Sequence, residues 1–515
     1  MYILKTDDNP FRSPGKKILV PLLLLLFGAH LIYYAGFTHD DPFISFRYAR
    51  NLASNKGLVF NEAERVEGYS NFLFLILLAP AEKIGVEFLG LSKIYGFFSA
   101  LACLLVFLFF LSSYYPLPKW QHGIAPLLLA LSGDMALWAV SGMETALIAF
   151  FVTAAWILFC REMKKTGNVF PFSALFFLAA ALTRPEGGIY FFCLLPFAFV
   201  LLRCKQIPGK YFFSWLLLFL VPFAIYNLWR VSYFGNLLPN TFYAKATGRL
   251  SLQADLGVIY LFSFLWHNPC LFLLGAFIPA LLKKKWQIER VSAAIIVLAQ
   301  ILFIVVCGGD WMPLSRFMVP VLIPLLFLFQ EGLFDTLELL KSRDPFFRLQ
   351  DALGLLLLLL VLLGIFQERR ITRPIVYSVK THTLYHPHIQ IGLWLKDNVP
   401  PGSLLAGEEA GIIPFYSQLR FLDLLGIVDP HISRQKGAMH LKHDVNYVLS
   451  RNPDYVILYT LNPMEKGEKL KARIASGDRL LESPKFRELY KPIKSFPHGN
   501  ELIGNDFLTL FKKMK

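Results

Sequence analysis

Two adjacent acids, Asp40 and Asp41, follow the first long apolar run of the chain in the stretch THDDPFI. A carboxylate held where a chain leaves a membrane can take a proton from a hydroxyl group, and partial burial raises its pKa towards that task. Asp41 before Pro42 also suits the start of a helix, because Asp accepts the free N–H groups of the first turn. We therefore predict Asp40 as the base and Asp41 as the helix cap. The alternative is that both acids only cap a helix.

Three cations are predicted on the same face of the membrane. Arg184 in LTRPEGG lies at the tip of a tight hairpin between two apolar runs, Lys245 ends NLLPNTFYAK, and Arg316 follows GGDWMPLS. Such residues at helix ends can also reach lipid phosphates with no further role. Several cations from different loops favour a phosphate leaving group, whose growing charge they stabilise. An acid and a set of cations on one face suit transfer from a phosphate.

Further residues on this face are predicted to bind the substrate. Tyr and Trp rings offer stacking surfaces and amides offer hydrogen bonds, although the same aromatic residues fit a membrane-interface belt. Glu144 in SGMET is near a helix end, where an acid is costly in lipid and indicates a site, whereas Asp310 is equally able to cap or to bind. The predicted set comprises Arg47, Glu144, Glu186, Tyr233, Asn240, Tyr243, Asp310 and Trp311.

Membrane helices are the elements that must position these residues. The 515 residues are 55% hydrophobic and only 17% charged, with 49 Phe and a mean hydropathy of +0.50, outside the range of soluble globular proteins. The formal charge of +15 is spread over short basic connectors between apolar runs, which indicates membrane orientation rather than nucleic-acid binding. The sequence has no P-loop and no Gly-rich dinucleotide turn, so nucleotide use is not expected.

Twelve apolar stretches are candidate spans, since a spanning helix takes about 20 residues. They are 18–36, 70–84, 93–115, 124–140, 143–160, 169–184, 186–203, 211–230, 269–283, 291–307, 314–333 and 350–366. The basic connectors place the N-terminus in the cytoplasm and require that 70–84 be interfacial or re-entrant. About 11 crossings result, or 12 to 13 with half-helices. The motifs named above then face outward.

The character of the chain changes at residue 370. LLAG, RFLDLLG and DYVILY are typical of strands, and HIQIGLWLKDNV and HDVNYVLSR of helices. We predict a polytopic α-helical membrane domain at 1–369, with a first external loop at 37–70, and an extracytoplasmic α/β domain at 370–515. The helix after Asp41 is expected to lie on the bilayer surface.

Five segments in chain order resemble the GT-C superfamily of integral-membrane glycosyltransferases: DDPFISFRYARNLASNKGLVFNEAERVEGYSNFL, SGMET, LTRPEG, YFGNLLPNTFYAK and GGDWMPLSRFMVP. Within that superfamily they resemble the group typified by the mycobacterial terminal β-(1→2)-arabinofuranosyltransferase. The resemblance covers most of residues 38–320 and continues more weakly into 413–432. His39 and Met143 depart from the typical pattern without removing a reactive group.

The resemblance implies a GT-C fold of about 11 to 13 transmembrane helices and a polyprenyl-phosphate sugar donor. A hexosyl or pentosyl group would pass, with inversion, to a cell-envelope glycan or glycolipid, such as lipopolysaccharide or arabinan, at the outer face of the bacterial inner membrane. The base would be a first-loop carboxylate, which corresponds to Asp40 and Asp41. The resemblance establishes no cofactor, and it leaves a divalent cation open. The alternatives are a transporter or flippase of lipid-linked saccharides, which usually shows internal repeats, and a sensor or assembly protein.

Overall fold

The computed structural model describes residues 14–115, 120–164, 169–246, 249–283, 287–341, 348–380, 386–438, 440–464, 469–500 and 504–514. The chain divides into two compact units, each assembled from segments that are far apart in the sequence. Unit 1 comprises Met1–Ala35, Lys93–Ala224 and Gln253–Thr372. Unit 2 comprises Gly36–Ser92, Ile225–Leu252 and Arg373–Lys515. The first loop therefore folds with the C-terminal residues.

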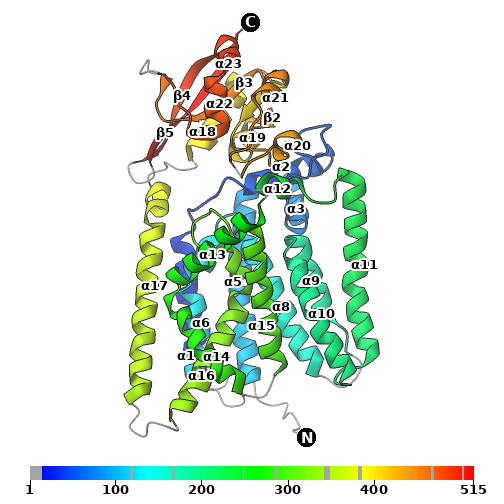
Figure 1. The fold of residues 1–515 in the computed structure, drawn as a ribbon, viewed down its shortest axis with the longest axis vertical. Coiled ribbons are helices and arrows are strands. Elements are labelled where there is room, and N and C mark those ends of the chain that lie inside the picture. The colour runs from blue at the N-terminus through cyan, green and yellow to red at the C-terminus, as the bar shows by residue number, and fades with distance from the viewer. Residues whose placement is uncertain are drawn as a thin grey trace. The chain divides into compact units, whose positions relative to one another are not determined.

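Unit 1 is a bundle of apolar helices (Figure 1). Helices form here because lipid offers no hydrogen-bond partners, so each backbone N–H and C=O must be satisfied within its own segment. The helices that lie mainly in unit 1 are α1 (Pro14–Tyr33), α5 (Phe88–Tyr114), α6 (Ile124–Ala130), α7 (Gly133–Ala139), α8 (Thr145–Lys164), α9 (Phe172–Thr183), α10 (Gly187–Arg203), α11 (Gly209–Phe234), α13 (Leu250–His267), α14 (Leu273–Lys283), α15 (Ile288–Cys307), α16 (Leu322–Lys341) and α17 (Arg348–Lys380). Three 3₁₀ turns accompany them: η1 (Trp120–Gly123), η2 (Pro269–Phe272) and η3 (Arg316–Val321).

The protein is a multi-pass membrane protein. Among the described residues six helices are long and apolar enough to cross a membrane, and a seventh span results if α13 and Pro269–Pro279, bent by 112°, count as one. Three shorter apolar helices accompany them. Long spans are thus fewer than the 11 to 13 predicted. One reason is the run 124–140, which breaks where Ser132 accepts a hydrogen bond from the N–H of Met135 and starts α7. Helix α13 was not predicted, because the polar residues SLQAD at its start shorten its apolar run.

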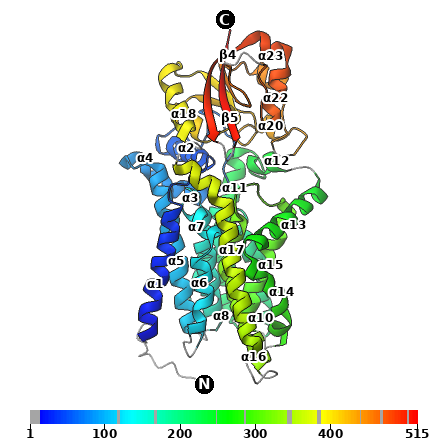
Figure 2. The same ribbon diagram turned by 90° about the vertical axis from the view of Figure 1, so that its left-hand side faces the viewer.

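The described residues of unit 2 form a mixed sheet of five strands in the order β2-β1-β3-β5-β4. Strand β1 pairs in parallel with β2 and β3, while β5 is antiparallel to β3 and β4. The strands are β1 (Leu404–Gly407), β2 (Arg420–Asp423), β3 (Tyr455–Thr460), β4 (Tyr490–Asn500) and β5 (Gly504–Lys513). The three predicted strands are confirmed as β1, β2 and β3. The β4–β5 pair, seen side by side in Figure 2, was not predicted.

Short helices make up the rest of unit 2, and the sheet core includes Val456, Leu458, Leu480, Phe486 and Phe511. The helices are α2 (Pro42–Ala53), α3 (Phe72–Leu78), α4 (Pro80–Ile84), α12 (Asn240–Lys245), α18 (His386–Asn398), α19 (Ile412–Ser417), α20 (Pro430–Ser433), α21 (Val445–Ser450), α22 (Ala475–Glu482) and α23 (Pro484–Leu489). The two helices predicted in the C-terminal region are confirmed as α18 and α21. The run 70–84 forms only α3 and α4, each too short to span a bilayer.

Helix α2 of the first loop is buried inside unit 2. The ring centroids of Phe43 and Phe46 lie 5.3 and 6.1 Å from that of Phe415 in α19. The prediction that this helix lies on the bilayer surface is therefore wrong. An amphipathic pattern shows that one helix face is covered, but it does not distinguish a membrane surface from a protein partner.

Candidate functional site

Asp40 anchors the first loop to the start of α19. Its side chain is buried, and Oδ1 accepts a hydrogen bond of 2.7 Å from the N–H of Ile412. A Cβ on Gly411 would lie 2.2 Å from the carbonyl oxygen of Asp40 and 2.3 Å from its Oδ2, so a side chain there would displace the acid. Burial, followed by the charge of Glu409, raises the pKa of Asp40 well above its usual value. Asp40 is thus not the open carboxylate that was predicted at the membrane boundary.

Asp41 is the more accessible acid of the pair. It precedes α2, but its side chain makes no capping hydrogen bond. The predicted capping role is wrong because the backbone of Asp41 is already helical, with φ −52° and ψ −37°, whereas a capping residue is typically extended. Its side chain is 27% exposed, and its Oδ1 lies 3.6 Å from Nδ1 of His39. Asp41 is therefore the carboxylate of the two that a substrate can reach.

Glu409 is a third carboxylate in this place, and it was not predicted. Its side chain is 21% exposed, accepts a hydrogen bond from the hydroxyl of Tyr459 and lies 3.2 Å from Nε2 of His388. Burial raises the pKa of Glu409 to about 7; the Tyr459 hydroxyl opposes the shift and the charge of Asp41 adds to it. A signal existed in the sequence, because GEEAG follows the strand LLAG, and ligands bind at the carboxyl ends of parallel strands.

His440 and Lys245 are two further ionisable groups of unit 2. Burial lowers the pKa of His440, the charge of Asp41 raises it and that of Lys245 lowers it again. The charges of Asp41 and Lys245 thus act on His440 in opposite directions. Lys245 is exposed at the last residue of α12. Lys245 is thus the predicted cation that belongs to the same unit as the first-loop acids.

Arg47 and Asn240, predicted to bind the substrate, are occupied by protein groups. Each joins segments that are distant in the sequence, and each is buried. The guanidinium of Arg47 donates to the carbonyls of Phe60, Pro414 and Leu419 and to Oδ1 of Asn61, while the amide of Asn240 donates to the carbonyls of Gly426 and Ile427 and accepts from the hydroxyl of Ser433. Through these hydrogen bonds both residues hold unit 2 together.

Tyr233 and Tyr243 also contact protein groups of unit 2. The hydroxyl of Tyr233 accepts a 3.2 Å hydrogen bond from the N–H of Leu58, and the guanidinium carbon of Arg65 lies 4.7 Å from its ring centre. The guanidinium carbon of Arg434 lies 4.7 Å from the ring centre of Tyr243. Each ring therefore already has a cation on one face.

In unit 1, Arg184 forms a buried ion-pair group with Glu144 and Glu186. Its Nη1 donates to Oε1 of Glu144 at 2.6 Å, and its Nε donates to Glu186. The side chains are 11%, 2% and 3% exposed, respectively. Three residues predicted to lie on one face of the membrane therefore contact one another. The two acids offset the charge that Arg184 would offer to a phosphate.

Arg316 lies beside this group. Its guanidinium carbon is 5.2 Å from the ring centre of Phe317, and that of Arg184 is 5.4 Å from the same ring centre. Nε of Arg316 pairs with Asp310, and Nη1 lies 3.2 Å from Sδ of Met143. Two of the three predicted phosphate-binding cations thus converge on one aromatic ring, each already paired with an acid.

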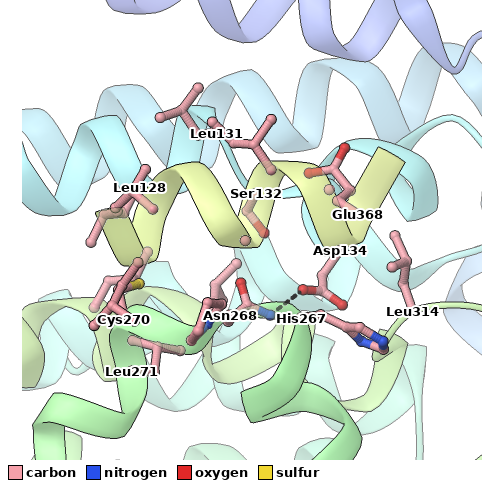
Figure 3. Close-up of a pocket in the computed structure, with 18 residues that line it drawn as sticks. Leu128, Leu131, Ser132, Asp134, His267, Asn268, Cys270, Leu271, Leu314 and Glu368 are labelled. Atoms are coloured by element: carbon pink, nitrogen blue, oxygen red, sulfur yellow. Dashed lines mark hydrogen bonds between the residues drawn. The ribbon is translucent and has the colours of Figure 1, made fainter. Parts of the chain in front are cut away.

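Trp311, the remaining predicted residue, has a ring that is 58% exposed. A separate small cavity of about 40 Å³ in unit 1 lies beside Asp134, whose carboxylate accepts a hydrogen bond of 2.9 Å from Nδ2 of Asn268 (Figure 3). The same carboxylate accepts a hydrogen bond of 2.6 Å from the N–H of Ser315. Most of the lining is apolar. A cavity of this size holds a few water molecules, whereas substrate pockets exceed roughly 300 Å³. We assign it no role in the reaction.

A divalent cation does not fit the first-loop acids. Among the described residues no group of three or more His, Cys, Asp or Glu side chains is arranged to hold a metal ion. Asp40 directs Oδ1 at a backbone N–H, and hard cations need carboxylate oxygens that are free to coordinate. We therefore derive no step through a metal.

Comparison with known proteins gives one family match and several structural neighbours. A domain of unknown function (DUF8728) matches residues 376–511, which lie in unit 2. No curated protein matches the chain. ArnT from Cupriavidus metallidurans, solved bound to undecaprenyl phosphate, is similar with a TM-score of 0.55 and 11% identity over 97% of this chain and 98% of ArnT. The archaeal oligosaccharyltransferase AglB from Archaeoglobus fulgidus, in complex with an inhibitory peptide and a dolichol-phosphate, is similar with a TM-score of 0.50 and 13% identity over 86% of this chain and 70% of AglB.

At these identities the likeness concerns the fold. The ArnT match extends over nearly the whole chain and so includes the segments of both units. The finer resemblance to the arabinofuranosyltransferase group stays a prediction. The chain has a GT-C type fold, in which a multi-pass helical membrane bundle is joined to a C-terminal α/β part.

Proposed function

We propose that this protein is a membrane glycosyltransferase that transfers a sugar from a polyprenyl-phosphate donor to a cell-envelope glycan or glycolipid. The observation that carries the proposal is the carboxylate group of Asp40, Asp41 and Glu409 in unit 2, with one acid open to a substrate. The structural neighbours support the donor class, because ArnT was solved with undecaprenyl phosphate and AglB with a dolichol-phosphate.

In this proposal Asp41 is the base and Asp40 is a positioning residue. Asp41 takes the proton from the acceptor hydroxyl while that oxygen forms a bond to the anomeric carbon. The bond from the anomeric carbon to the phosphate oxygen breaks, its electron pair leaves with the lipid phosphate, and the configuration inverts. Asp40 holds the loop through its hydrogen bond to the N–H of Ile412, which keeps the neighbouring carboxylate in place.

Arg184, Arg316 and Lys245 are proposed to bind the donor phosphate, whose growing charge a guanidinium or ammonium group stabilises. The pairing of Arg184 with Glu144 and Glu186 fixes the orientation of its planar guanidinium and offsets part of its charge. Lys245 is the exposed cation of the three. Trp311, which is 58% exposed, is proposed to stack on a sugar ring.

The orientation follows from the basic connectors and belongs to the proposal. We place the N-terminus in the cytoplasm of a bacterium and the C-terminal domain outside the inner membrane, so the reaction occurs at the outer face. The acceptor class is a glycan or glycolipid of the cell envelope. Profiling of these glycans in a deletion strain, in search of a missing terminal residue, identifies both sugar and linkage.

Single carboxylate-to-amide variants test the assignment. Membranes with wild type, Asp41→Asn, Asp40→Asn or the matched exposed control Asp397→Asn are assayed for sugar transfer from a polyprenyl-phosphate donor. We expect Asp41→Asn to lose a factor of about 100 or more, as for removal of a general base. Asp40→Asn should lose less, because an amide oxygen still accepts a hydrogen bond. If both variants keep full transfer, the catalytic proposal is wrong.

The alternative function is a transporter or flippase of lipid-linked saccharides. It predicts that the wild type moves intact lipid-linked sugar across vesicles without making a glycoside. A sensor or assembly protein predicts neither activity and no need for Asp41. The transfer assay and a vesicle translocation assay on the same preparation separate the three.

A further inference from the structure

A pocket of about 290 Å³ in unit 2 is lined by more positive than negative charge. One wall comes from the first loop and the other from residues 402–420. Four cations line it, namely Arg47, Arg50, Lys56 and Arg420, against the single acid Glu62. None of them has a part in the proton transfer or phosphate binding proposed above.

Arg47 places a buried charge at this pocket without an anionic partner. Its four hydrogen bonds go to three carbonyl oxygens and one amide oxygen, all neutral. Within the described ranges no carboxylate forms an ion pair with it. Burial, followed by the charge of Arg50, lowers the pKa of Arg47 to about 9, while the charges of Glu62 and Glu64 oppose the shift. A buried charge without an ion-pair partner is costly, so an anion in the pocket would stabilise the protein.

Arg50 adds a second guanidinium to the same wall. Its carbon lies 3.6 Å from the ring centre of Phe415, and Nη1 donates to the carbonyl of Phe415 at 2.9 Å. The nearest acid to Arg50 is Glu82, at 3.9 Å from Nε. Burial lowers the pKa of Arg50 as well. An anion that contacts both Arg47 and Arg50 reduces the repulsion between these two positive charges.

Lys56 and Arg420 form the exposed rim of the pocket, where their side chains can exchange one ion-pair partner for another. Their side chains are 48% and 53% exposed, and they pair with Glu62 at 2.7 Å and Glu64 at 3.3 Å. Ion pairs between exposed side chains contribute little free energy and give way readily to a stronger ligand. The side chains of Lys56 and Arg420 can therefore turn towards an anion, while Arg47 and Arg50 stay held by their hydrogen bonds.

Size and position indicate what kind of anion fits. The volume is near the lower end for ligand pockets, which suits one charged sugar unit and not a lipid. Helix α2 connects the pocket to the catalytic candidate, because Arg50 follows Asp41 by nine residues. At a rise of 1.5 Å per residue, the two lie about 13 Å apart along the helix axis.

We propose that this pocket binds an anionic group, a phosphate or a carboxylate, of the saccharide that accepts the sugar. The acceptor is then held at a charged unit about 13 Å along α2 from the hydroxyl that reacts. The identification as an acceptor site rests on the proposed function, whereas anion binding does not.

Binding of small sugars to the full chain in phosphatidylcholine nanodiscs tests this inference. Saturation-transfer NMR titrations compare glucose 6-phosphate and glucuronate with neutral glucose. The double variant Lys56→Gln/Arg420→Gln removes the rim, and Lys396→Gln/Arg479→Gln removes an exposed Lys and an exposed Arg elsewhere in unit 2. We expect the rim variant to bind the charged sugar about tenfold or more weakly, because each lost charge-assisted hydrogen bond costs roughly that factor. The control should bind as the wild type does.

The comparison of charged sugars shows which anion the pocket takes, and preference for either one over glucose supports the inference. Raising the salt concentration from about 50 to about 500 mM should weaken binding through screening. Equal affinity of the rim variant and the control, or equal affinity for glucose, overturns the inference. Asp41→Asn should keep this binding while losing transfer. If the wild type shows the binding contrast but no transfer, the proposed function fails and the anion site stands.

Discussion

Replacing Gly411 by Ala changes the support of Asp40 without altering any ionisable group. The added Cβ would lie 2.2 Å from the carbonyl oxygen of Asp40, 2.3 Å from its Oδ2 and 2.4 Å from its Cγ. Contacts this short cannot be relieved by rotating the carboxylate alone, because the backbone oxygen is also in the way. The first loop or the start of α19 must therefore shift.

We expect this shift to reduce both stability and transfer. Overpacking by one methyl group costs about 1–3 kcal/mol, or a fall in the melting temperature of roughly 2–10 °C. Because Asp41 is the next residue, its carboxylate moves with the loop. A displacement of about 1 Å at a reacting group lowers the rate by about a hundredfold.

The assay combines thermal unfolding of the full chain in detergent with sugar transfer in membranes. Gly90→Ala is the matched control in unit 2, because its Cβ would approach only the flexible end of Glu87, at 3.3 Å. It should melt at or above the wild-type temperature and keep full transfer. A Gly411→Ala variant that melts and transfers like the wild type refutes the packing argument. Normal transfer with lowered stability refutes only the link between Asp40 and the reaction.

Three further perturbations follow from buried charges. Arg184→Met leaves the carboxylates of Glu144 and Glu186 buried without a cation and should cost about 3–5 kcal/mol, seen as a lower melting temperature. In an Arg47→Lys variant the ammonium group has too few donors for the four oxygens that the guanidinium contacts. The variant should lose about 2 kcal/mol of stability, again seen as a lower melting temperature. Burial raises the pKa of Glu408 from 4.5 to about 7. Between these two pH values Glu408 loses its proton in the unfolded chain but keeps it in the folded protein. The free energy of unfolding should therefore fall by roughly 3 kcal/mol as pH rises from about 4.5 to 7, and stay level above pH 7. Glu408→Gln should remove this dependence of the melting temperature on pH.

Each of these expectations has a result that contradicts it. For Arg184, the triple variant with Gln at both acid positions should recover part of the loss, and no recovery means that the acids were not the cause. An Arg47→Lys variant within about 0.5 kcal/mol of wild type, the range of ordinary surface changes, shows that the four bonds do not hold unit 2 together. A pH slope that survives in Glu408→Gln belongs to another group.

Patterns within short windows of sequence predict much of this fold. Apolar runs indicate the membrane helices, and the alternating segments indicate β1, β2 and β3, because both depend on which residues face lipid or a core. Helix α2 begins at Pro42 as predicted. The β4–β5 pair escaped prediction, since the charged and proline-containing segment YKPIKSFPHGN lacks a clear alternation.

The roles of the two adjacent acids depend on a contact with Ile412, which lies more than 350 residues further along the chain. Residue type and spacing mark Asp40 and Asp41 as candidates, but they do not show that a backbone N–H of α19 occupies Asp40 while Asp41 stays open. Glu409 joins the acids for the same reason, because its place at the end of β1 matters only once the first loop packs there. Local sequence therefore supplies the carboxylates, and long-range packing selects among them, since burial and hydrogen bonding decide which oxygen can meet a substrate.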